Sequence, residues 1–171
     1  MVYDLDRKLA SLQKYQQRVV LHPRRWRSFK PATPLTWESV RFGSGSVQDV
    51  PQQRGIYTFV VHFQDYTKGP FALPTHGYIL YGGITGARAQ HRTLRDRFQE
   101  YLREKQRGKR VNIHRMLNTW PKDLFFYYAV VGQSTDLGAL ELALNDAVIP
   151  PFVENDFSAA VRPLVKALRS H

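Results

Sequence analysis

The chain has 171 residues, of which 43% are hydrophobic and 13% aromatic, so its length and composition predict one globular domain and exclude a disordered chain. It contains no cysteine, which excludes disulfides, thiolate nucleophiles and cysteine zinc sites and is typical of a cytoplasmic protein. Its formal net charge of +11 favours a polyanionic partner.

The positive charge is concentrated in two segments. Residues 1–50 carry nine Lys/Arg against four Asp/Glu, a net +5, and residues 88–115 carry ten against three, a net +7. The segment between them is close to neutral, and residues 116–171 are slightly acidic. Two basic segments around a neutral centre predict nucleic-acid binding. A basic protein with solvated charged faces is the alternative.

The N-terminal part combines a helix with a basic arm. Leu5, Leu9 and Leu12 recur near helical spacing and predict a helix over residues 3–20. Residues 22–36 form an arginine- and proline-rich arm that includes Trp26, and we place the start of the core near residue 50. The early acids do not resemble a signal peptide and no apolar run has the length of a membrane span, so we expect no membrane association.

The rest of the chain alternates apolar runs with amphipathic segments. Runs rich in β-branched and aromatic residues predict strands over residues 55–63, 78–81 and 124–131. Apolar residues at helical spacing predict helices over residues 92–106, 111–118, 136–149 and 158–170. The long loop of residues 64–75 joins the first two strands into a hairpin.

This element order predicts an α/β (α+β) sandwich with a small three-stranded, largely antiparallel sheet flanked by helices. We divide the chain into an N-terminal helix and basic arm (1–50), a core (51–157) and a C-terminal helix packed on the core (158–171).

Two tyrosines lie on the strands of the predicted hairpin. Tyr57 follows Gly55-Ile56, and Tyr81 precedes Gly82-Gly83, where a phosphate backbone could approach closely. A phenol with its ordinary pKa of about 10 is a poor base at neutral pH unless cations lower that pKa. Both tyrosines could instead fill one face of the sheet.

An arginine and a carboxylate occur on the predicted helices. Arg97 and Tyr101 are four residues apart and share one helix face, where the guanidinium can grip a phosphate. Glu141 interrupts the apolar stripe of Leu137, Leu140 and Leu144. A carboxylate there needs a cation, and a hard oxygen ligand suits Mg²⁺, although a nearby arginine is an alternative partner. These groups are the parts needed to cut a phosphodiester bond.

Other cofactor chemistry is less well supported. The six histidines show no paired metal spacing, although His62 and His76 flank the hairpin loop and could reach the site. Gly82–Gly86 lacks the lysine of a nucleotide-cradling loop, so we expect no nucleotide cofactor.

Taken in order, these residues resemble the motifs of the GIY-YIG nuclease family. Gly55-Ile56-Tyr57 matches the first motif, and Tyr81-Gly82-Gly83 matches the second with Gly in its middle position. Further matches are the helical arginine Arg97 with Tyr101, the metal-binding Glu141, and the late asparagine Asn155. The resemblance covers about residues 55–157. The spacer between the tyrosines is long, as in restriction-type members, and the lysine that often follows the second motif is missing, with Arg88 nearby as a substitute.

The resemblance implies a DNA endonuclease that depends on Mg²⁺ or Mn²⁺, with one ion per active site. Tyr57 would activate or position the water, Arg97 would stabilise the phosphate, and Glu141 would hold the metal, supported by Tyr81, Tyr101 and Asn155. From the charge pattern we expect DNA to contact the basic residues Arg24, Arg25, Arg27, Arg88, Arg103, Lys105, Arg107, Lys109 and Arg110.

The biological role stays open between three readings. A restriction or mobile-element defence enzyme is expected to act as a twofold homodimer, because one site cuts one strand. A structure- or single-strand-specific repair nuclease would nick as a monomer. A nucleic-acid-binding module without catalysis is the alternative from another class.

Overall fold

The sheet has four antiparallel strands, one more than the sequence predicts. The computed structural model describes residues 2–62, 77–87 and 92–170. The strands β1 (Glu38–Arg41), β2 (Gly55–His62), β3 (Gly77–Thr85) and β4 (Leu124–Val130) pair in the order β1-β4-β2-β3. The predicted α+β class is therefore confirmed. The predicted loop of residues 64–75, with His76 and Arg88, lies outside the described residues.

The added strand is β1, which pairs with β4 from Glu38 opposite Tyr128 to Arg41 opposite Phe125. The hydroxyl of Tyr128 donates to Glu38 Oε2 at 3.0 Å across this pair. The prediction missed β1 because the strand is short and mostly polar, so it carries little of the apolar signal by which strands are recognised. It also precedes residue 50, so the sheet includes a segment that the predicted boundary assigns to the arm.

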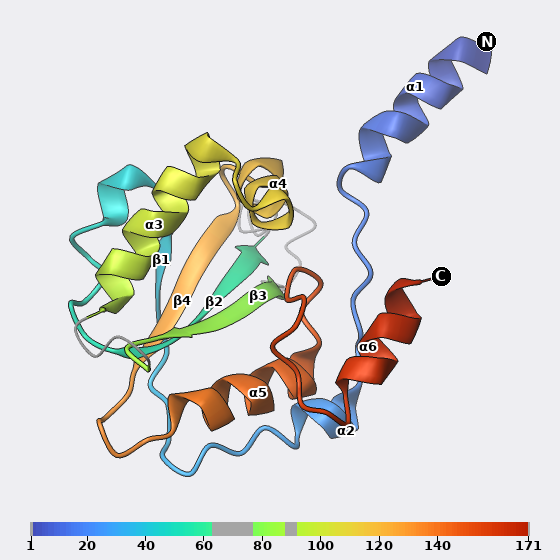
Figure 1. Cartoon of the computed structure of the whole chain (residues 1–171). Helices are drawn as coiled ribbons and strands as arrows, with labels where there is room; N and C mark the ends of the chain where they lie inside the picture. Colours follow the sequence, from blue (N-terminus) through green and yellow to red (C-terminus); the bar gives the residue numbers. More distant parts are fainter. Residues whose placement is uncertain (1, 63–76, 88–91, 171) are drawn as a thin grey trace, which may run out of the picture.

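Helices cover both faces of the sheet (Figure 1). They are α1 (Val2–Gln13), α2 (Pro23–Trp26), α3 (Leu94–Arg107), α4 (Val111–Thr119), α5 (Leu137–Val148) and α6 (Arg162–Arg169). The first helix ends seven residues before the predicted end at residue 20, and α6 begins four residues after the predicted start at residue 158.

The two sheet faces bury different side chains because neighbouring residues of a strand point to opposite sides. On β2, Tyr57 and Phe59 belong to the core cluster that includes Phe98 of α3. Ile56 belongs to the cluster on the other side, with Leu140 of α5. The core is thus split by the sheet, and α3 and α5 lie on opposite faces of it.

The helices that carry predicted site residues have defined ends. Thr93 caps α3 in a reciprocal capping box with Asp96, and Gly108 ends it with a φ of 66°, which glycine adopts without strain. Asp136 caps α5 by accepting from the backbone N–H of Ala139. Ile149 follows α5 with a φ of 51°, a costly conformation for a β-branched residue.

The N-terminal segment lies only partly on the body. Figure 1 shows α1 projecting away from the sheet, whereas α2 lies beside the end of α5. Arg25 of α2 donates to the backbone oxygen of Asp146 at 3.2 Å. Phe29 and Trp37 pack against the α5 side of the core. In the described parts of the chain, no helix combines the length and apolar character needed to cross a membrane.

Candidate active site

Three predicted site residues meet in one hydrogen-bonded cluster on the α3 side of the sheet. The guanidinium Nε of Arg97 donates to the Tyr57 hydroxyl at 2.9 Å, and the Tyr57 and Tyr101 hydroxyls lie 2.8 Å apart. Both tyrosines are fully buried. The spacing of four residues also brings the Arg97 guanidinium to 5.2 Å from the Tyr101 ring centre, as a shared helix face predicts.

Tyr81 joins this cluster from the neighbouring strand. In the β2–β3 register Tyr57 lies opposite Gly83 and Phe59 lies opposite Tyr81, which places Tyr57 and Tyr81 diagonally on the same face. Their rings stack with centroids 6.5 Å apart. Tyr81 also packs edge-on against Tyr101 at 6.1 Å. The register therefore brings together the two tyrosines that the sequence places 24 residues apart.

The two glycines after Tyr81 make room for protein groups. A Cβ atom at Gly83 would lie 2.5 Å from the Tyr57 hydroxyl oxygen, and one at Gly82 would lie 2.5 Å from Asn145 Oδ1. Neither position accommodates a side chain without displacing a buried residue. The space that we predicted for a phosphate backbone is thus already filled by Tyr57 on one face and by Asn145 on the other.

Burial dominates the acid–base properties of the tyrosines. It raises the pKa of Tyr57 well above the ordinary value, and repulsion from Tyr101 and Tyr81 adds to the effect, while the Arg97 charge opposes it. Burial raises the pKa of Tyr81 in the same way. Tyr57 is therefore a neutral phenol at pH 7 in this structure. It can accept a hydrogen bond through its oxygen, but it cannot serve as a phenolate base until the balance of charges changes.

Glu100 is a site neighbour that the sequence analysis missed. Its carboxylate accepts from Arg97 Nη1 at 2.9 Å and also pairs with Arg92. Burial acts to raise the pKa of Glu100, but the hydrogen bonds from both arginines outweigh it and hold that pKa below its ordinary value. Glu100 thus fixes the far side of the Arg97 guanidinium. Its position three residues after Arg97, on the same helix face, is the signal that could have identified it.

A small cleft opens beside Tyr81 and contains Asn155. It has a volume of about 320 Å³, and Arg110, Glu154 and Asp156 also line it. The guanidinium of Arg110 lies 5.0 Å from the centre of the Tyr101 ring, so the cleft borders the buried cluster. We call it the tyrosine cleft. Sequence reasoning identified Asn155 but not its two acidic neighbours, Glu154 and Asp156, which place hard oxygen donors at the same opening.

Glu141 lies on the α5 side of the sheet, opposite to the cluster around Tyr57. It is half-buried on α5, whereas the buried polar residue of this helix is Asn145, one turn later on the same face. Asn145 donates to the backbone oxygen of Asp156 at 3.0 Å and so holds the segment that carries Asn155. Because Asn145 contacts Gly82, the Glu141 side of α5 runs along β3, the edge strand next to the tyrosines.

The described carboxylates offer two separate places for Mg²⁺, since the structure does not bring them to one point. Mg²⁺ keeps several waters and is usually held by one or two carboxylates. Glu141 on one side of β3 and the oxygens of the tyrosine cleft on the other are the available ligands. Within the described ranges, no three His, Asp or Glu side chains gather closely enough to bind a metal by themselves.

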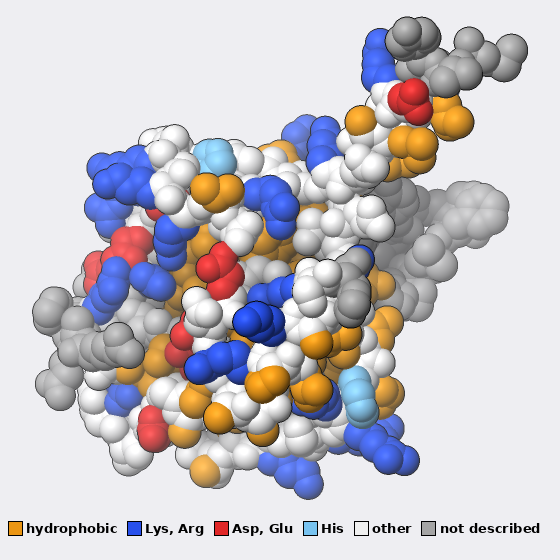
Figure 2. Space-filling view, turned by 45° about the vertical axis from the view of Figure 1, so that its right-hand side comes forward, with side chains coloured by type: hydrophobic (Ala, Val, Ile, Leu, Met, Phe, Trp, Pro, Cys, Tyr) orange, Lys and Arg blue, Asp and Glu red, His pale blue; other side chains and the backbone are white. Residues whose placement is uncertain are grey.

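The predicted basic residues occupy several surfaces. Lys and Arg side chains gather on the left of the face in Figure 2, with acidic side chains between some of them. Arg24, Arg27, Arg103, Arg107 and Lys109 are exposed. Arg25 donates to the Asp146 backbone oxygen, and the Lys105 ammonium lies 5.9 Å over the Phe42 ring.

His62 lies on the α5 face of the sheet, where it bonds to the Tyr127 hydroxyl at 2.9 Å, away from Tyr57.

Comparisons of the chain with protein-family models, with curated proteins and with solved structures give no match. The resemblance to GIY-YIG nucleases therefore rests on the site residues named above and on their order in the chain.

Proposed function

We propose that this protein is a divalent-metal-dependent DNA endonuclease of the GIY-YIG type, with a role in restriction or mobile-element defence. The observation that carries the proposal is the contact between Arg97 and the Tyr57 hydroxyl, with Tyr101 and Tyr81 against it. Residues from two strands and one helix converge there beside the tyrosine cleft, which Arg110 and the acidic residues Glu154 and Asp156 line. Absence of cysteine and the lack of a membrane-spanning helix in the described residues support a cytoplasmic location as part of the proposal.

In this proposal each site residue has a distinct role in phosphodiester hydrolysis. Tyr57 positions the attacking water through its hydroxyl oxygen, and Arg97 orients that hydroxyl and compensates negative charge on the phosphate. Glu141 holds the metal ion, and Tyr101, Tyr81 and Asn155 keep the geometry. When bound, Mg²⁺ or Mn²⁺ supplies positive charge to the phosphate and the leaving oxygen.

One observation favours a second candidate, a nucleic-acid-binding protein without catalysis. The Tyr57 hydroxyl is buried, and Arg97 is shared between that hydroxyl and Glu100, so the cluster satisfies its own hydrogen bonds. Such a cluster can be a purely structural polar network.

Incubation with supercoiled, linear and single-stranded DNA, in Mg²⁺ or in EDTA, separates the two candidates. The proposal expects cleavage that depends on the metal and is lost in Arg97→Ala. The matched control is Lys166→Ala, which removes an exposed positive charge from α6, outside the residues expected to contact DNA. Salt-dependent binding by the wild type with no cleavage of any substrate would reject the nuclease and support the binding protein.

A further inference from the structure

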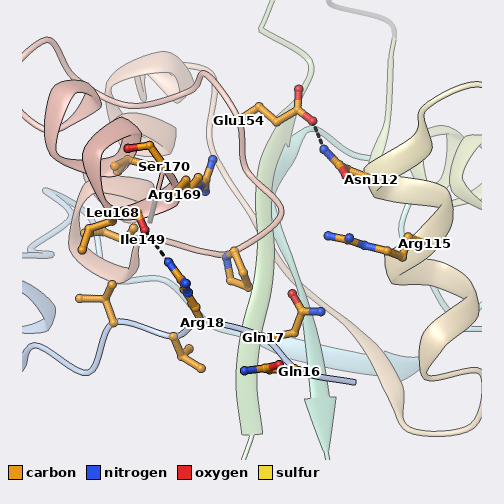
Figure 3. Close-up of a pocket in the computed structure, with 14 residues that line it drawn as sticks. Gln16, Gln17, Arg18, Asn112, Arg115, Ile149, Glu154, Leu168, Arg169 and Ser170 are labelled. Carbon is orange, nitrogen blue, oxygen red and sulfur yellow. Dashed lines mark hydrogen bonds between the residues drawn. The ribbon is translucent and has the colours of Figure 1, made fainter. Parts of the chain in front are cut away.

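A second, larger cleft lies between three segments that are distant in sequence. Its walls are the segment after α1 (residues 16–20), the α4 helix and the last turn of α6, and its volume is about 890 Å³ (Figure 3). Ile149 and Pro151 also line it. We call it the arginine cleft. None of the residues that the sequence analysis assigned to the site lies in it.

Three arginines give this cleft its charge. Arg18, Arg115 and Arg169 come from the three different walls, and Figure 3 shows Arg115 reaching from α4 across the opening. The one carboxylate among the lining residues is Glu154, which already accepts a hydrogen bond from Asn112 Nδ2. Arg18 donates to the backbone oxygen of Leu168 at 3.1 Å, and the charge of Glu154 acts on Arg169. Three arginines against one carboxylate still make the lining net positive, which favours an anionic ligand.

Two of the arginines are held in place by aromatic rings. The guanidinium of Arg115 lies 5.2 Å from the centre of the Phe152 ring, and that of Arg169 lies 5.8 Å from the centre of the Phe157 ring. A guanidinium seated on a ring loses less side-chain freedom when it binds a ligand. Arg169 Nη2 also donates to the backbone oxygen of Pro150 at 3.1 Å, so Arg169 offers its other N–H groups to phosphate oxygens.

The arginine cleft adjoins the tyrosine cleft. Asn112 and Glu154 line both openings, while Tyr81 and Asn155 line the tyrosine cleft alone. An extended ligand that enters between α4 and α6 would therefore pass these two shared residues before it reaches Tyr81.

We propose that the arginine cleft binds the phosphodiester backbone of a single nucleic-acid strand and leads that strand to the tyrosine cleft. The volume matches a pocket for a small ligand or a short piece of chain, about 300–1,000 Å³, and a duplex would have to lie across its walls without entering. The inference rests on the proposed function, since it specifies the substrate of the same site. It specifies a single-stranded or flapped segment as the part of the DNA that enters the site, whether or not a duplex flanks that segment.

Binding without catalysis provides the first test. In EDTA, the Arg115→Ala/Arg169→Ala double variant is titrated with a fluorescent oligothymidylate of about 12 nucleotides, a length that small single-strand-binding folds cover. We expect its affinity for this strand to fall by roughly tenfold or more, and the salt slope to become shallower by about 1.4, which is two phosphate contacts. Affinity for a blunt duplex should change by less than about threefold.

Arg41→Ala is the matched control. Arg41 lies on β1, outside the cleft, with its guanidinium 5.6 Å over the Phe125 ring, so the substitution removes the same charge and the same ring contact elsewhere. A measurement on the wild type avoids any folding defect: amide hydrogen exchange should show slowing by the oligothymidylate at residues 16–20 and in α4 and α6. Equal affinity and slope in the double variant, or no slowing at these segments, would overturn the inference.

Cleavage of the same strand in Mg²⁺ distinguishes the two proposals. If the double variant loses single-strand binding while the wild type cuts nothing, the arginine cleft is supported and the nuclease fails. If the wild type cuts with metal and the double variant cuts single strands equally well, the nuclease is supported and the arginine cleft fails.

Discussion

At the scale of single residues, the candidate site depends on a phenol that the fold has made less acidic. Tyr57 is fully buried, and its hydroxyl accepts from Arg97 and lies against Tyr101. The positive charge of Arg97 favours the phenolate, but burial outweighs it, so the pKa of Tyr57 is raised. A metal ion or a substrate that adds charge beside Tyr57 would shift the pKa of its hydroxyl, while the surrounding side chains would keep the ring in place.

We predict that Tyr57→Phe lowers the cleavage rate by roughly a hundredfold or more, because the ring packing stays and the hydroxyl that positions the water is lost. The same change leaves the Arg97 Nε without its partner and should destabilise the fold by about 1–3 kcal/mol, so activity is measured well below the melting temperature. Tyr127→Phe is the control, since it removes a hydroxyl bonded to His62 on the other sheet face. Normal cutting by Tyr57→Phe would make the residue structural.

The raised pKa of Tyr57 also predicts the pH dependence of cleavage. Because the hydroxyl stays protonated from pH 7 to 9, kcat/KM should show no rise in this range that depends on Tyr57. The profiles of the wild type and of Tyr57→Phe should therefore have the same shape. A rise of about tenfold per pH unit in the wild type alone would mean that a phenolate fraction acts as the base and would contradict positioning by the neutral hydroxyl.

Glu141 and Glu154 are the competing carboxylates for the metal. We predict that Glu141→Gln abolishes Mg²⁺-dependent cleavage while DNA binding stays within a few-fold, because metal charge acts mainly on the transition state. Glu154→Gln is the comparison, since Glu154 lies in the tyrosine cleft and already bonds to Asn112. Loss of cleavage in Glu154→Gln with full activity in Glu141→Gln would move the metal to the tyrosine cleft.

At the scale of elements, the helices and strands with a strong apolar periodicity could be predicted from the sequence, and the short polar strand could not. The apolar runs of β2 and β4 and the stripes of α3 and α5 match the structure to within a few residues, because burial imposes their periods. The polar strand β1 was missed because its pairing with β4 is set by tertiary contact. The positions of Arg97 and Tyr101 on one helix face followed from spacing alone, whereas the meeting of Tyr57 with Tyr81 required the register of the sheet.

Because spacing alone does not reveal tertiary contacts, the sequence also did not show which polar group of α5 is buried. Glu141 and Asn145 both interrupt the apolar sequence of α5, and the pattern predicts the charged Glu141 as the anomaly. The structure buries Asn145 completely and leaves Glu141 half-buried. A neutral amide costs less to bury than a carboxylate, and here one of its groups is paired with the Asp156 backbone. Which of two polar residues lies inward depends on the helix orientation, which spacing alone does not fix.

The α2 element tests the predicted basic arm. Arg24 and Arg27 are exposed there, whereas Arg25 is tied to the Asp146 backbone. We predict that Arg24→Ala/Arg27→Ala weakens binding to every duplex sequence and makes the salt slope shallower by about 1.8, which is two phosphate contacts. Arg25→Ala should instead lower stability by about 1 kcal/mol through the lost hydrogen bond. An unchanged slope in the double variant would place the arm away from DNA.

At the scale of the whole molecule, α1 has an apolar face that the described fold does not cover. Leu5, Leu9 and Leu12 are 60%, 48% and 65% exposed, although their spacing puts them on one side of the helix. The following segment behaves differently, because Val20 packs against the α6 side of the core. Residue 20 therefore contacts the folded body, whereas α1 projects away from the sheet (Figure 1).

We predict that α1 pairs with the α1 helix of a second copy, which would place two active sites on one duplex. A helix of 12 residues is only about 18 Å long. Burying the area that six such leucines still expose yields about 5–10 kcal/mol, which does not exceed the cost of association of about 4–15 kcal/mol, so the dimer should be weak alone and complete on DNA. Sedimentation should therefore show mainly monomer without DNA and two chains per duplex with it.

The triple variant Leu5→Ser/Leu9→Ser/Leu12→Ser should leave nicked circles in place of linear plasmid. The control Leu164→Ser, at an exposed leucine of α6, should still give linear plasmid. One chain per duplex in the wild type, with nicks as the only product, would contradict the dimer and favour the single-strand nuclease.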